Sequence, residues 1–342
     1  MTKVTNNIDF SENNVLISFE GVAWGCGFYI GVYKALIDRY GYEKIKKLKF
    51  AGTSSGALTA CVCCLGIKWE ILYDYYKTLS DVCEKYGPFG KVSIYYHFII
   101  KYLFDSSPTI YQTLNNRLFI GVTRFFNKNE TINYWNSNQE VIDTLNGSMN
   151  IPIYCTYIPN VADINIIDGA ISKSFIIDNK INTITVSYID KYADISGHDE
   201  FKLKDLYTAM SIKRLDFILE LGYHRTRAFF ETIDSSSSNN VIIYNNPTSS
   251  TNLLNLPTII NTPNFNDIFL SQHYINITKL NKKKYNNFIV FIMWLMFLIA
   301  KLKKYSFYHL YKEIISIISI LYFFRFIFRK IKLITTTRFL LT

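Results

Sequence analysis

The first 65 residues repeat one pattern, in which a short apolar run leads through a glycine-containing turn into a helical segment. Val15–Phe19 is typical of a buried strand, residues 20–27 hold three glycines, and Phe28–Tyr40 has apolar residues at helical spacing. Leu48–Ala51 begins a second strand, and Ala57–Leu65 has the composition of a buried helix. Because parallel strands are joined by crossover helices, this order predicts an α/β fold with a mostly parallel sheet.

The rest of the chain is predicted in less detail. Helices are expected over Trp69–Lys85 and Phe201–Thr232, and strands over Ile153–Tyr157, Ile164–Ile167 and Thr183–Ser187. The aromatic-rich residues 92–142 give no assignment. No internal repeat is evident.

The turn after the second strand is the most informative motif. Gly52-Thr53-Ser54-Ser55-Gly56 matches G-x-S-x-G, in which flanking glycines permit a sharp strand-to-helix turn with an exposed serine at its apex. The apolar strand before it and the helix after it are the context that this nucleophile elbow requires. Ser54 occupies the apex and Ser55 is a rival, while an ordinary structural turn is the alternative interpretation.

A serine nucleophile needs a base, and the chain offers two kinds. In the chain order of α/β-hydrolases, His198 or His224 would serve, although the first lies in a polar loop and the second at a predicted helix start. Asp168 is the other candidate, because it follows an apolar strand and precedes Gly169. The residues alone leave these alternatives open.

Several blocks in this order resemble the patatin-like phospholipases, and more closely their adipose triglyceride lipase and adiponutrin-like branch. The similarity covers roughly residues 15–232. It is carried by Ser18-Phe19-Glu20-Gly21, Gly52 to Ala60, Ile151-Pro152-Ile153-Tyr154, Ile167-Asp168-Gly169-Ala170-Ile171-Ser172 and Thr183 to Ser187, with further likeness near Leu203 to Leu206, Gly222-Tyr223 and Arg227 to Phe229.

The resemblance implies a three-layer α/β sandwich with a mostly parallel central sheet and a serine esterase site. Ser54 would attack the ester carbonyl, and Asp168 would accept its proton without any histidine. The expected substrates are glycerolipids, either triacylglycerol or phospholipid, cleaved through an acyl-serine intermediate. No metal or other cofactor is implied.

The oxyanion loop departs from the family pattern. The resemblance implies that backbone amides of Gly21, Val22, Ala23 and Ser55 hold the oxyanion, with Gly52 and Gly56 shaping the elbow. The family's loop usually reads G-x-G-x-x-G, but Ala23 and Cys26 replace its later glycines here. Losing one donor can cost ~10²–10³ in rate. A weakly active or inactive lipid-surface protein therefore stands as an alternative, beside an acyltransferase.

Cysteine usage and the first residues indicate an intracellular, reduced protein. The chain has six cysteines, and residues 1–14 are polar, without the apolar run of a signal peptide. Cys61, Cys63 and Cys64 form a close cluster, but no nearby histidine completes a metal site. Packing of small apolar side chains in a helix is the preferred interpretation.

Charge and hydropathy set the end of the chain apart. The net charge is +10, yet residues 279–342 hold ten Lys and three Arg against one acid, and residues 1–278 hold 24 basic and 26 acidic side chains. Apolar stretches at residues 288–300 and 314–324 are shorter than the ~20 residues of a spanning helix. Basic residues around them predict an apolar, basic helical tail that lies on an anionic membrane or lipid-droplet surface. A spanning hairpin and a buried helix pair are the alternatives.

The expected domains are an acyl-hydrolase domain over residues 10–232, a Ser/Asn-rich flexible linker over 233–278 and a membrane-associating tail over 279–342. Nucleic acid is not an expected partner, since the tail lacks polar side chains that read bases. Protein regulators are not indicated by any motif.

Overall fold

The computed structural model describes residues 10, 14–86, 92–124, 128–151, 155, 166–206 and 208–236. The chain divides into two units, Met1–Tyr274 and Ile275–Thr342, and all of the described residues lie in the first. The predicted tail, and nearly all of the predicted strand at residues 153–157, lie outside the described residues.

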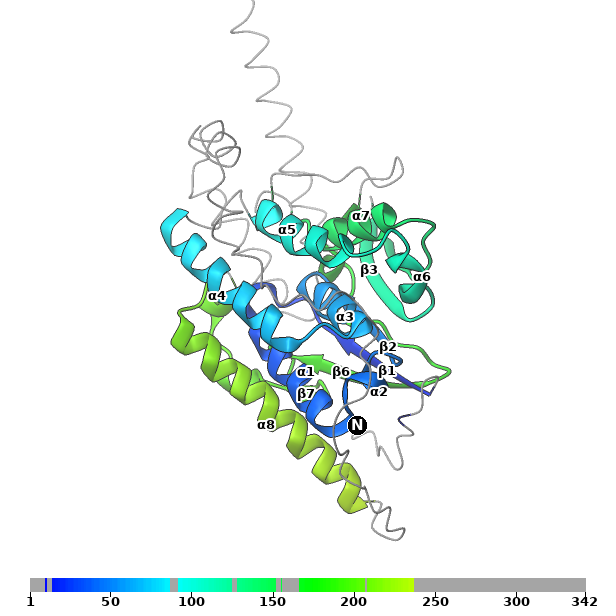
Figure 1. Cartoon of the computed structure of the whole chain (residues 1–342). Coiled ribbons are helices and arrows are strands. Elements are labelled where there is room, and N and C mark those ends of the chain that lie inside the picture. The colour runs from blue at the N-terminus through cyan, green and yellow to red at the C-terminus, as the bar shows by residue number, and fades with distance from the viewer. Residues whose placement is uncertain are drawn as a thin grey trace, which may run out of the picture. The chain divides into compact units, whose positions relative to one another are not determined.

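The first unit is built around a mostly parallel sheet (Figure 1). Its strand order is β4-β3-β2-β1-β6-β7, and β5 pairs with β3. Only β4 and β5 run antiparallel to β3, and the other pairs are parallel. The strands are β1 (Val15–Phe19), β2 (Lys49–Thr53), β3 (Leu118–Arg124), β4 (Lys128–Ile132), β5 (Ile166–Ile167), β6 (Asn182–Ser187) and β7 (Ile195–Ser196). The predicted α/β class with a mostly parallel sheet is confirmed.

Helices connect these strands. They are α1 (Gly27–Tyr40), α2 (Tyr42–Ile45), α3 (Ser55–Leu65), α4 (Trp69–Tyr86), α5 (Val92–Phe104), α6 (Ile110–Leu114), α7 (Asn138–Ser148) and α8 (Ile212–Ser236), with short 3-10 helices η1 (Ala23–Cys26), η2 (Gly169–Ile171), η3 (His198–Glu200) and η4 (Leu203–Leu206). The first four predicted elements and the helix beginning at Trp69 are confirmed, with small shifts at their ends.

The two faces of the sheet are covered differently. Helix α3 packs on β1, β2 and β3, and α8 runs beside α1 (Figure 1). The core on the helical face includes the stacked rings of Phe19 and Phe50. On the other face, Leu16 and Ala51 pack against Ile176 from the segment between η2 and β6. The central strands are therefore buried on both faces, which explains why four of the five residues of β1 are apolar and why buried Ser18 accepts a hydrogen bond from the Ile176 amide.

The helix predicted over residues 201–232 begins later than expected. Only α8 is a long helix there, and η4 precedes it as a separate turn. Buried Asp205 in η4 accepts a hydrogen bond from the guanidinium of Arg214 at 2.8 Å, and Arg214 also donates to the hydroxyl of Tyr188. This ion pair holds the chain in a bend that helical spacing alone does not reveal. His224 consequently lies in the middle of α8 and not at a helix start.

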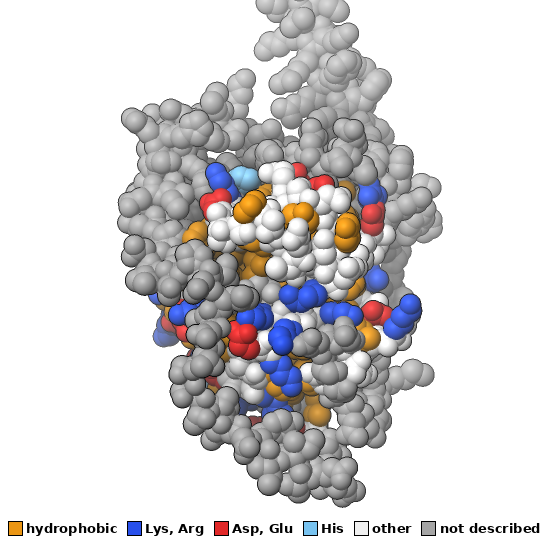
Figure 2. Space-filling model, turned by 45° about the vertical axis from the view of Figure 1, so that its right-hand side comes forward, with side chains coloured by type: hydrophobic (Ala, Val, Ile, Leu, Met, Phe, Trp, Pro, Cys, Tyr) orange, Lys and Arg blue, Asp and Glu red, His pale blue; other side chains and the backbone are white. Residues whose placement is uncertain are grey.

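The surface charges of this unit are unevenly spread. Figure 2 shows Lys and Arg side chains gathered on one part of a face, next to an area with few charges.

Candidate active site

Ser54 lies at a strained turn between β2 and α3. Its φ is 54° and its ψ is −130°, a conformation that non-glycine residues rarely adopt. Gly52 and Gly56 allow the turn to close, because a Cβ on Gly52 would lie 2.3 Å from the backbone of Gly56. A Cβ on Gly56 would lie 2.5 Å from the carbonyl oxygen of Phe19. The G-x-S-x-G sequence therefore forms the sharp strand-to-helix turn that its spacing predicts.

Asp168 meets this serine from the end of β5. The hydroxyl of Ser54 donates a hydrogen bond to Asp168 Oδ2 at 2.6 Å, and the other carboxylate oxygen accepts the amide N–H of Ala170 at 2.9 Å. Ser54 is 5% exposed and Asp168 is 1% exposed. This short hydrogen bond joins two side chains that are 114 residues apart in sequence.

The histidines within the described ranges have other partners. His198 Nδ1 lies 2.8 Å from the carbonyl oxygen of Ile189. His224 is largely exposed and lies 3.7 Å from Glu220 on the same helix. Burial lowers the pKa of His97, whose ring is next to Asn146. Asp168 is thus the titratable group that contacts the Ser54 hydroxyl, among the residues that the structure describes.

Two amides of the predicted oxyanion loop are bound by hydroxyls that flank the nucleophile. The N–H of Gly21 donates to Thr53 Oγ1 at 3.0 Å, and the N–H of Val22 donates to Ser55 Oγ at 3.1 Å. Both hydrogen bonds are buried. They fasten the loop after β1 to the elbow from both sides of Ser54.

The other two predicted donors are placed differently. Ser55 begins α3, where a backbone N–H has no partner within its own helix. Ala23 begins η1 with φ of 48°, so an alanine holds a left-handed conformation where the family pattern has glycine. No partner for either amide is recorded among the described residues. Among the four amides, those of Ala23 and Ser55 thus differ from those of Gly21 and Val22, which hydroxyl groups already bind.

Cys26 anchors the far end of η1. Its thiol hydrogen-bonds the hydroxyl of Tyr76 from α4. Burial raises the pKa of the Cys26 thiol to about 12, so the sulfur is a neutral packing group and not a nucleophile. Cys61, Cys63 and Cys64 are likewise buried in α3. Within the part of the chain that the structure describes, no three His, Cys, Asp or Glu side chains are grouped as a metal site.

Sequence reasoning missed the residues that hold the elbow from outside its motif. Ser148, at the end of α7, accepts the backbone N–H of Ser54 at 2.9 Å. Thr123 on β3 donates to the carbonyl oxygen of Asp168 at 2.8 Å. Neither residue belongs to a recognisable motif, because their roles depend on contacts across 94 and 45 residues of sequence.

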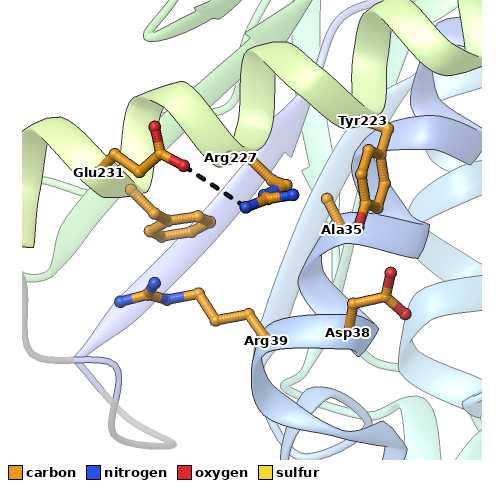
Figure 3. A pocket seen from close by; sticks show the side chains of 7 residues that line it. Ala35, Asp38, Arg39, Tyr223, Arg227 and Glu231 are labelled. Carbon is orange, nitrogen blue, oxygen red and sulfur yellow. Dashed lines mark ion pairs between the residues drawn. The ribbon is translucent and has the colours of Figure 1, made fainter.

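A separate pocket of about 300 Å³ lies between α1 and α8 (Figure 3). Arg227 there is 3.6 Å from Glu231. The pocket is lined by Ala35, Asp38, Arg39, Tyr223, Arg227, Phe230 and Glu231. Its lining includes neither Ser54 nor Asp168, so the pocket is separate from this pair of residues.

Comparisons with known proteins agree with the motif. No family model matches the chain. The chain is 30% identical over 187 residues to human patatin-like phospholipase domain-containing protein 2, covering 51% of this chain and 36% of that protein. It is 27% identical over 188 residues to omega-hydroxyceramide transacylase of Mus musculus, covering 54% and 31%. The chain thus spans about a third of the length of these relatives.

A solved structure, VipD from Legionella pneumophila, aligns with a TM-score of 0.40 at 12% identity, over 65% of this chain and 67% of that one. Among the described helices, none combines the length and apolar character needed to cross a bilayer.

Proposed function

We propose that the chain, which is similar to patatin-like phospholipases, is a lipid acyl hydrolase that cleaves glycerolipid esters through Ser54 and Asp168. The observation that carries the proposal is the 2.6 Å hydrogen bond from Ser54 Oγ to Asp168 Oδ2. Both groups are buried, and the serine stands at a strained turn between a strand and a helix. Strain of this kind is found preferentially at functional sites.

In the proposed reaction, Ser54 Oγ attacks the ester carbonyl carbon while its proton passes to Asp168 Oδ2. The bond to the alcohol then breaks, and the proton on Asp168 moves to the departing oxygen. Water attacks the acyl-serine next, giving a proton to the same carboxylate and releasing the fatty acid. The proton finally returns to Ser54, so the dyad ends each turnover unchanged.

Charge on the tetrahedral intermediate would be held by the amides of Ala23 and Ser55. The N-terminus of α3 adds a favourable dipole at that point. In this proposal Gly21 and Val22 serve to fix the loop, because Thr53 and Ser55 hydroxyls already accept their N–H groups. The proposal therefore needs no glycine at position 23, only an N–H aimed at the intermediate.

A fluorophosphonate probe tests the assignment in the full chain, because it labels activated serines. Ser54→Ala should abolish labelling, and Asp168→Asn should slow it by at least ~10²-fold, in line with losses for removed general bases. His224→Ala is the control and should label like the wild type, since that ring is exposed and paired with Glu220. Wild-type labelling in Asp168→Asn would refute the dyad. A wild-type chain without Ser54-dependent labelling would favour a non-catalytic lipid-surface protein.

A second candidate is acyl transfer to an alcohol. It is favoured by the similarity to a protein named as a transacylase. The acyl-serine is common to both reactions, and only the acceptor differs. Incubation with a labelled triacylglycerol or phospholipid, with and without a long-chain alcohol, measures free fatty acid against new ester. Ester formation that exceeds hydrolysis would assign the chain as a transferase.

For the remaining sequence, we propose that residues 10–232 form the catalytic domain, 233–278 a linker and 279–342 an attachment to membranes or lipid droplets inside the cell. An insoluble substrate makes adsorption useful, since it brings the site to the ester. Deletion of residues 280–342 should preserve activity on a soluble short-chain ester and reduce flotation with lipid vesicles or droplets. A truncated chain that still floats would refute the role of the tail.

A further inference from the structure

The end of α7 and the residues just after it contact the backbone of both proposed catalytic residues. Ser148 Oγ accepts the N–H of Ser54 at 2.9 Å. Two residues later, the carbonyl oxygen of Asn150 accepts the N–H of Asp168 at 3.0 Å. One short segment therefore fixes the nucleophile and its base relative to each other.

The Ser148 hydroxyl is itself held in place. It donates to the carbonyl oxygen of Gly121 on β3 at 2.7 Å, and its side chain is 0% exposed. A hydroxyl has one proton to donate, and here that proton is committed to the sheet. The lone pair that faces Ser54 is thus fixed in direction, with no solvent to replace it.

Close packing reinforces the same arrangement. A Cβ on Gly147 would lie 2.1 Å from Ile166 in β5, so α7 rests directly on the strand that leads to Asp168. A Cβ on Gly169, the residue after that aspartate, would lie 1.9 Å from the Gly121 carbonyl oxygen. The Gly121 carbonyl group therefore accepts the hydrogen bond from Ser148 and also packs against Gly169, the residue after Asp168.

Ser54 has particular need of such support. Its left-handed φ of 54° is sparsely populated for a residue with a side chain, so the surrounding structure must maintain it. The hydroxyl of Ser148 binds the N–H of this same residue. A bond from a separate element to the amide at the apex opposes relaxation of the turn.

We propose that Ser148 is a positioning residue for acyl transfer, which holds the Ser54 backbone in its strained conformation and so keeps Ser54 Oγ on Asp168. The proposal rests on the function proposed above. Ser148 itself contacts neither substrate nor reacting atoms. Its removal should slow the chemical step without altering substrate binding.

The test uses the full chain with a soluble short-chain ester and the fluorophosphonate probe. Ser148→Ala should lower kcat and the labelling rate by about 10- to 100-fold with KM unchanged, because a buried N–H loses its acceptor. Thr144→Val is the matched control. Thr144 lies on the same helix, is also buried, and accepts the buried Trp135 Nε1–H at 3.0 Å. It should reduce the melting temperature similarly but leave kcat unchanged.

Wild-type kcat in Ser148→Ala, or an equal loss of kcat in Thr144→Val, would overturn the proposal. If Ser148→Ala does not fold, Ser148→Cys decides, because a thiol is nearly the same size but a weaker acceptor. A reduced kcat at unchanged KM then supports the proposal, and a wild-type kcat refutes it. If the wild-type chain shows no Ser54-dependent labelling, the proposed function is refuted, and the role proposed for Ser148 is refuted as well.

Discussion

Replacing Ala23 by glycine should make the protein more stable. Ala23 is half-buried and holds φ at 48°, in the left-handed region. That conformation costs a residue with a Cβ about 1–2 kcal/mol. Glycine gains about 0.5–1 kcal/mol of extra freedom in the unfolded chain, which opposes the benefit. The expected net gain in unfolding free energy is about 0.5–1 kcal/mol.

Thermal unfolding followed by circular dichroism measures this gain. For a folded unit of this size, the net gain corresponds to a rise of about 1–4 °C in Tm. Asn116→Gly is the matched control, because Asn116 has φ of 60° but asparagine tolerates this region far better than alanine. Ala23→Val should move Tm the other way, since a β-branched side chain is worse at positive φ.

The reasoning is refuted if Ala23→Gly leaves Tm unchanged or lowers it. It is also refuted if Asn116→Gly gives an equal rise, because the gain would then come from glycine itself and not from relief at position 23.

Four further predictions concern buried groups. Gly169→Ala should abolish esterase activity and lower Tm, because the added Cβ would lie 1.9 Å from the carbonyl oxygen of Gly121 and displace the loop after Asp168. Wild-type activity in this variant would contradict the prediction. Burial raises the pKa of the Cys26 thiol from 9.0 to about 12, so between these pH values the unfolded chain loses this proton while the folded chain keeps it. The contribution of Cys26 to the unfolding free energy is therefore complete below pH 9.0 and is lost as the pH rises to about 12. The unfolding free energy should therefore fall above pH 9. Separately, all six thiols are buried and should react with Ellman's reagent only after unfolding in guanidinium chloride. Rapid reaction in the native protein would contradict their burial. Asp205→Ala should lower the unfolding free energy, measured by urea titration, by about 1.5–3 kcal/mol, because the partly buried Arg214 loses a charged hydrogen-bond partner but keeps the Glu200 carbonyl oxygen. A loss below about 1 kcal/mol would contradict the role of this ion pair.

The nucleophile elbow could be predicted because its determinants are local. A strand, a turn of small residues and a helix are adjacent in sequence, and glycine is required wherever backbones approach closely, as at Gly52 and Gly56. Asp168 was open to prediction only as one of several bases. Its meeting with Ser54 depends on β5 pairing with β3, which no local pattern encodes.

The features that could not be predicted from the sequence depend on contacts between residues that are far apart in the chain. Ser148 and Thr123 resemble any other small hydroxyl residues until the fold places them beside the dyad. Strand β3, Leu118–Arg124, lies in an aromatic-rich stretch whose composition hides the boundary between helices and strands. The late start of α8 was not predicted, because the Asp205–Arg214 ion pair that joins η4 to α8 leaves no mark in the apolar periodicity.

The two oxygens of Asp168 are not equivalent, and this bears on the choice between hydrolysis and transfer. Oδ1 is tied to the Ala170 amide, so the carboxylate cannot rotate to offer either oxygen at will. In the proposed mechanism every proton, from serine, water or an alcohol, must pass through Oδ2. Water and alcohols therefore compete for one place beside a single atom. Whether hydrolysis or acyl transfer dominates then depends on whether water or an alcohol reaches Oδ2 of Asp168. The residues around the dyad control this access, while the chemical steps are the same in both reactions.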